Sequence, residues 1–222
     1  MEERITTPPD EYASLALREI VRRPRPSERR TVLDLGRPSS HNVRFFSDLN
    51  CKLYISDFFE SLIETGTGAR QGEEAFDQAC SRLLHFSDEP RFDFILAWDL
   101  LNYLRMSEVQ ILVSHLRRLS RPGTRLLALV SIYQKIPDKP FHFIALAGER
   151  VRYESSTTVH RDSPRHKELE LLQRMGGFAV DTCLLLRHGM REYSFVLADD
   201  PGRADDPGPA ADPGPAAEVA SG

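Results

Sequence analysis

Two short apolar runs in the N-terminal third of the chain constrain its fold more than any other feature. The first covers residues 31–35, contains Asp34 near its end and stops at Gly36. The second covers residues 51–56 and is followed at once by Asp57. Runs of this length and composition predict two buried strands joined by a short helix. Each strand would then carry an aspartate at its carboxyl end, which is the edge where open α/β sheets bind ligands.

These two strands resemble the start of the class I S-adenosylmethionine-dependent methyltransferases. The first motif of that family, a strand ending in an acid and a glycine loop, is similar to residues 32–36, Val-Leu-Asp-Leu-Gly. The ribose-binding acid of the family corresponds to Asp57, and the residue that packs on the adenine corresponds to Phe58. The resemblance implies S-adenosyl-L-methionine as the cofactor.

The loop after Gly36 departs from the family pattern. Residues 37–40 read Arg-Pro-Ser-Ser, where the family usually has two further glycines. A dinucleotide needs such glycines because its two phosphates approach the backbone closely, whereas S-adenosylmethionine has no phosphate. Ser39 or Ser40 can cap the helix expected over residues 41–49. The degenerate loop therefore argues more strongly against NAD than against S-adenosylmethionine.

The rest of the chain continues the alternation of strands and helices. The pattern predicts an α/β fold with a Rossmann-like, doubly wound, mostly parallel seven-stranded sheet and a terminal antiparallel hairpin. The expected strands cover residues 31–35, 51–56, 83–86, 92–98, 124–132, 178–186 and 192–197.

The fourth expected strand ends in Trp98 and Asp99, and it is similar to the family's fourth-strand motif. Methyl transfer depends chiefly on positioning, and a general base is needed only if the acceptor must lose a proton. The candidate bases are Asp99, His142 and His160. The cofactor-binding residues implied by the resemblance are Asp34, Leu35, Gly36, Asp57, Phe58, Trp98 and Asp99.

We expect three parts in the chain. Residues 1–30 would form an N-terminal helix, capped by Asp10, and a basic linker. Residues 31–198 would form the methyltransferase-like domain, in which the irregular segment 133–164 is expected to be a long loop on the acceptor side. The acidic tail, 199–222, is rich in Pro, Gly and Ala and is expected to be disordered.

Composition excludes several classes of protein. No apolar run is long enough to span a membrane, and the three cysteines have no metal or redox spacing, which favours the cytoplasm. The basic stretch 18–30 lacks interleaved aromatic residues, which disfavours a nucleic-acid partner.

The sequence therefore predicts an enzyme that transfers a methyl group from S-adenosylmethionine to a small molecule or a peptide. The alternative is a catalytically inactive, methyltransferase-like binding or regulatory protein, which the missing glycines suggest. An NAD-dependent reductase is a third hypothesis, and both the degenerate loop and the terminal antiparallel hairpin oppose it.

Overall fold

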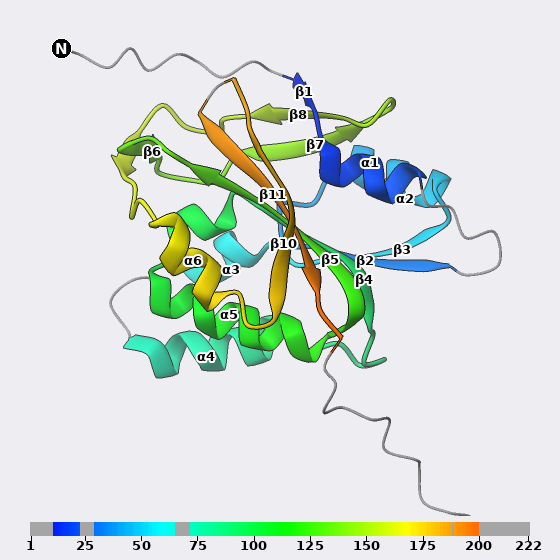
Figure 1. The fold of residues 1–222 in the computed structure, drawn as a ribbon, viewed down its shortest axis with the longest axis horizontal. Coiled ribbons are helices and arrows are strands. Elements are labelled where there is room, and N and C mark those ends of the chain that lie inside the picture. Colours follow the sequence, from blue (N-terminus) through cyan, green and yellow to red (C-terminus); the bar gives the residue numbers. More distant parts are fainter. Residues whose placement is uncertain (1–10, 23–28, 65–71, 188, 200–222) are drawn as a thin grey trace, which may run out of the picture.

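A mixed six-stranded sheet forms the centre of the molecule (Figure 1). The computed structural model describes residues 11–22, 29–64, 72–187 and 189–199. In these residues the central sheet has the order β10-β11-β5-β4-β2-β3. Strands β3, β2, β4 and β5 are parallel, and β11 is antiparallel to both β5 and β10. The predicted α/β class and terminal antiparallel hairpin are therefore confirmed. The strands are β2 (Arg30–Asp34), β3 (Cys51–Ile55), β4 (Phe92–Trp98), β5 (Ser120–Ser131), β10 (Phe178–Leu185) and β11 (Met190–Leu197).

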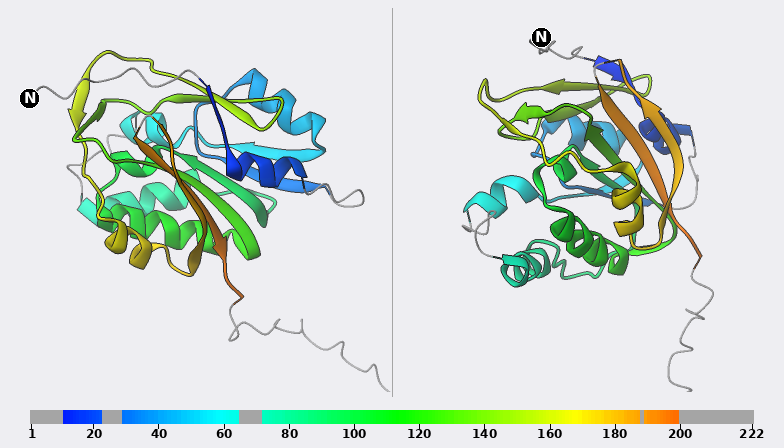
Figure 2. Two further views of the ribbon diagram at one scale, coloured as in Figure 1. Left: turned by 45° about the horizontal axis from the view of Figure 1, so that its top comes forward. Right: turned by 60° about the vertical axis from the view of Figure 1, so that its left-hand side comes forward.

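Helices cover both faces of this sheet (Figures 1 and 2). One face carries α3 (Phe58–Glu64), α4 (Gly72–Leu83), α5 (Met106–Arg118) and α6 (Glu168–Arg174). The other carries α1 (Leu15–Arg22) and α2 (Ser40–Asp48). Side chains of β4 alternate between the two cores, with Ile95 on the first face and Phe94 and Leu96 on the second. Burial on both faces explains why the parallel strands are almost continuously apolar.

The seventh strand, expected over residues 83–86, is not formed. Helix α4 extends to Leu83, and the backbone N–H of Leu84 donates to the carbonyl of Cys80 over 2.9 Å. The next residue, His85, donates in the same way to Arg82 over 3.4 Å. These backbone groups complete the end of a helix, so they are not available for a sheet ladder. Strand β3 is consequently an edge strand of the sheet.

The prediction of a long loop over residues 133–164 is also wrong, because this segment forms four short strands. They are β6 (Lys135–Pro137), β7 (His142–Leu146), β8 (Arg150–Glu154) and β9 (His160–Asp162). Strand β6 pairs with β9, and β7 and β8 form a hairpin beside a turn at Gly148, whose φ is +73°. Residues of β8 are alternately buried and exposed, which is the pattern of a strand with one covered face.

The N-terminal segment begins with a strand before its helix. Strand β1 (Glu11–Ala13) pairs with β8 and completes a three-stranded accessory sheet with β7. Helix α1 then starts at Leu15, and the Ser14 hydroxyl accepts a hydrogen bond of 3.0 Å from the N–H of Leu17. The predicted cap Asp10, part of the basic linker and the tail 200–222 lie outside the described residues. In the described part of the chain, no helix has the length and apolarity required to cross a membrane.

Candidate functional site

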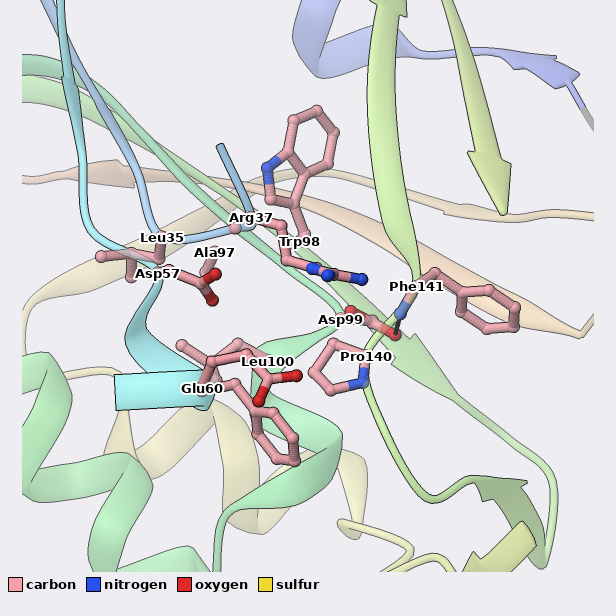
Figure 3. A pocket seen from close by; sticks show the side chains of 12 residues that line it. Leu35, Arg37, Asp57, Glu60, Ala97, Trp98, Asp99, Leu100, Pro140 and Phe141 are labelled. Atoms are coloured by element: carbon pink, nitrogen blue, oxygen red, sulfur yellow. Dashed lines mark hydrogen bonds between the residues drawn. The ribbon is translucent and has the colours of Figure 1, made fainter. Parts of the chain in front are cut away.

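A pocket lies at the carboxyl ends of β2, β3 and β4 (Figure 3). Its space is about 360 Å³, including its opening to solvent. Four segments line it: residues 35–37, residues 57, 59 and 60, residues 97–100, and residues 140 and 141. This is the edge at which open α/β sheets bind ligands. The last segment precedes β7 and brings the region of the accessory sheet to the pocket.

Asp34 supports this pocket without lining it. Its side chain is 1% exposed, and Oδ1 accepts hydrogen bonds from the Gly36 N–H at 2.9 Å and the Trp98 Nε1–H at 2.7 Å. Oδ2 accepts a third from Asn42 Nδ2 at 3.2 Å. Burial raises the pKa of Asp34 to about 6. Asp34 is thus not among the lining residues, and its carboxylate joins the loop, the indole and α2 through these hydrogen bonds.

Gly36 and Trp98 are in close contact at the base of the pocket. A Cβ atom on Gly36 would lie 2.8 Å from Cδ1 of Trp98, so the contact requires glycine. Trp98 has a positive φ of +48°, and its ring stacks on Phe143 with centroids 4.9 Å apart. Asn42 fixes this region further, because its Nδ2 donates to the Phe143 carbonyl and its Oδ1 accepts from the Ala145 N–H.

Asp57 lines the pocket where the sequence predicts it. Its carboxylate accepts a hydrogen bond from the backbone N–H of Glu60 and so also caps α3. Burial raises the pKa of Asp57, and the positive charge of Arg37 opposes this rise. The neighbouring Phe58, in contrast, is fully buried in the core and packs edge-to-face on Phe76. Phe59 lines the pocket in its place, because successive side chains of a helix point in different directions.

Asp99 is the most deeply buried charged group of the pocket wall. Its side chain is 2% exposed, and Oδ2 accepts a hydrogen bond of 3.1 Å from the N–H of Phe141. The other oxygen, Oδ1, has no hydrogen-bond partner among the described residues. Burial raises the pKa of Asp99 to about 7. An aspartate with these properties suits either a ligand that donates hydrogen bonds or the transfer of a proton near neutral pH.

The two histidine candidates do not line the pocket. His142 lies on β7, and burial together with the nearby charge of Arg37 lowers its pKa. His160 lies on β9, is exposed, and approaches the Thr158 carbonyl through Nδ1 at 3.0 Å. Of the three predicted bases, only Asp99 is brought to the pocket.

The charged groups around the pocket are mostly acidic. Asp57, Glu60 and Asp99 line it together with Arg37, which is the only cation among the described lining residues. Glu60 forms an ion pair of 3.1 Å with Lys139. Sequence reasoning missed Arg37 and Glu60, although Arg37 stands in the stretch where the family has glycine. No cluster of three or more His, Cys, Asp or Glu side chains suited to a metal occurs in the described residues.

No protein-family model and no curated protein matches the sequence. A protein from Pyrococcus horikoshii OT3 is structurally similar at 14% identity, covering 83% of this chain and 92% of its own, with a TM-score of 0.46. A 1,6-didemethyltoxoflavin N1-methyltransferase from Burkholderia thailandensis, with bound S-adenosylhomocysteine, is 14% identical, with 84% and 80% coverage and a TM-score of 0.44. Magnesium protoporphyrin IX methyltransferase from Synechocystis PCC 6803, with bound S-adenosylmethionine, is 15% identical, with 82% and 76% coverage and a TM-score of 0.44. All three TM-scores lie below 0.5.

Proposed function

We propose that the protein is an S-adenosylmethionine-dependent methyltransferase that acts on a small-molecule or peptide acceptor. The observation that carries this proposal is the position of Asp57, an acid at the carboxyl end of β3 whose side chain faces the pocket (Figure 3). A carboxylate at this place accepts hydrogen bonds from the two hydroxyls of a ribose. The pocket at the ends of three parallel strands supports the same assignment.

The charge of the pocket favours S-adenosylmethionine over NAD. Three carboxylates and one guanidinium line it, and the sulfonium cofactor is a cation. The pyrophosphate of a dinucleotide carries negative charge and would be repelled by the same carboxylates. Pro38 has no backbone N–H, which removes one donor that a phosphate would need.

We assign the cofactor contacts to Leu35, Gly36, Asp57 and Trp98, with Phe59 in the place expected for Phe58. Asp34 positions the loop through its hydrogen bond to the Gly36 N–H. When bound, the cofactor supplies an activated methyl group, and the chain's own residues orient the reactants and exclude water. Of the three predicted bases, Asp99 alone lines the pocket, where its carboxylate can bind and orient a ligand.

Calorimetric titration of S-adenosylmethionine and S-adenosylhomocysteine into the full chain tests this function. We expect both to bind, and we expect Asp57→Ala to weaken both. Asp57→Ser keeps an oxygen that caps α3 but shortens the side chain, so it separates loss of ribose contacts from loss of the cap. Asp48→Ala, at the exposed end of α2, is the matched control.

The outcomes distinguish the two hypotheses that the sequence suggests, an active methyltransferase and an inactive binding or regulatory protein. Wild-type protein that binds neither compound would refute the proposal. Binding without methylation of any acceptor in a screen of small molecules and peptides would favour the inactive binding protein, which the departure of residues 37–40 from the glycine pattern suggests.

A further inference from the structure

Two opposite charges face the pocket without pairing with each other. Asp99 is buried in the pocket wall, and the side chain of Arg37 runs across the pocket in its direction (Figure 3). In the part of the chain that the structure describes, no ion pair within 4.0 Å joins these two groups. A gap therefore separates a guanidinium from a carboxylate inside one pocket.

The carboxylate side of this gap lacks a hydrogen-bond donor. Oδ2 of Asp99 is held by the N–H of Phe141 at 3.1 Å, whereas Oδ1 has no partner in the described residues. A buried acceptor without a partner has lost its hydrogen bonds to water and gained none in return, and this cost is larger for a charged group. A ligand that places a donating cation against Oδ1 recovers this free energy.

The opposite side of the gap is suited to an anion. The loop around Arg37 offers few backbone donors, because Pro38 has none and the Ser39 hydroxyl faces the N–H of Asn42 at 3.5 Å. The guanidinium of Arg37 instead offers several N–H groups in the planar arrangement that matches a carboxylate. The remaining charged lining residues, Asp57 and Glu60, are acids, so an anionic group is repelled from the other walls.

We propose that Arg37 and Asp99 together recognise an α-amino-acid group, with its carboxylate on the Arg37 guanidinium and its ammonium on Oδ1 of Asp99. This inference rests on the proposed function, in which the methionyl end of S-adenosylmethionine carries such a group. An amino-acid acceptor carries the same chemistry. In either case the two opposite charges fix the direction in which the zwitterion lies, and the side chain of Arg37 replaces the backbone amides of a glycine loop.

Ligands that lack one charge test each half of the proposal. The first pair is S-adenosylmethionine and its decarboxylated form, and the second is S-adenosylhomocysteine and its analogue without the amino group. Wild-type protein is expected to bind the truncated member of each pair about tenfold more weakly or worse, because a charge-assisted hydrogen bond is lost. Arg37→Ala should abolish only the first preference, and Asp99→Asn only the second.

The matched controls are Arg44→Ala and Asp48→Asn, two exposed charges on α2 that do not line the pocket. Both should retain the two preferences. Binding is followed by calorimetry and by the fluorescence of Trp98, the single tryptophan, which lines the pocket.

A second titration, with L-methionine, identifies the source of the amino-acid group. If the methionyl end of the cofactor occupies the gap, L-methionine should bind beside 5′-deoxyadenosine, which lacks the sulfur, and should be blocked by S-adenosylhomocysteine. If an acceptor occupies it, L-methionine should bind the S-adenosylhomocysteine complex. In both cases Arg37→Ala and Asp99→Asn should weaken the binding of L-methionine.

The proposal is overturned if Arg37→Ala and Asp99→Asn leave the wild-type preferences and L-methionine binding unchanged, or if they weaken both members of a pair equally. Failure of the proposed function looks different, because wild-type protein would then bind no adenosyl compound. L-methionine binding that depends on Arg37 and Asp99 would still support the inference in that event, and its absence as well would overturn both.

Discussion

At the scale of single residues, the site is held by a hydrogen-bond network that the sequence reveals only in part. Asp34 and Gly36 are recognisable because they lie at the end of an apolar run that predicts a strand. Asn42 is not recognisable, since its partners Phe143 and Ala145 lie 101 and 103 positions further along the chain. Nothing local to Asn42 distinguishes it from an ordinary helical asparagine.

Asn42→Ala should destabilise the protein by roughly 3 kcal/mol, because it leaves the buried Phe143 carbonyl and Ala145 N–H without partners. It also removes one donor to Asp34. Urea unfolding monitored by circular dichroism measures the change. The control is His41→Ala, at the exposed neighbouring position. A loss below about 1 kcal/mol would contradict this role for Asn42.

At the scale of elements, the strands and helices of the central sheet follow from local apolar patterns, whereas the accessory strands do not. The alternation in β8 is present in the sequence, but a run of five residues, three of them charged, is a weak signal. Strand β1 has only three residues and is defined by its pairing with β8. Helix α1 depends on a distant residue too, since Oε1 of Glu192 accepts from the Ser14 hydroxyl at 2.5 Å and the Ala16 N–H at 3.1 Å.

Ser14→Ala should destabilise the protein by about 1–2 kcal/mol, because the N–H of Leu17 loses its cap and Glu192 loses a buried donor. Thermal unfolding compares this variant with wild type. Ser40→Ala, at an exposed position in the first turn of α2, is the control. A melting temperature equal to that of the control would show that Ser14 does not stabilise α1.

At the scale of the whole molecule, two buried carboxyl groups couple stability to pH. Burial raises the pKa from 3.8 to about 6 for Asp34 and to about 7 for Asp99. Between about pH 4 and pH 7, the folded protein therefore binds more protons than the unfolded chain. The stability that these groups contribute is fully present below about pH 4 and is lost as the pH rises through 6 and 7.

Asp99→Asn should remove part of this dependence. The amide oxygen can still accept from the N–H of Phe141, but it does not titrate. Between pH 8 and pH 5, wild type should gain on the order of 3 kcal/mol relative to the variant. His142 has a lowered pKa and acts in the opposite direction in both proteins, so the difference between them isolates Asp99. Parallel stability curves would refute the assignment.

The hydrogen bond between Ser14 and Glu192 spans 178 positions, so its two residues are synthesised far apart in time. Nearly the whole folded part of the chain must leave the ribosome before the start of α1 can form its buried hydrogen bonds with Glu192. The partner strand of β1, β8, likewise emerges about 140 residues later. Contacts between residues that are far apart in the sequence slow folding. The N-terminal segment therefore cannot complete its contacts until most of the chain has been synthesised, although it is itself synthesised first.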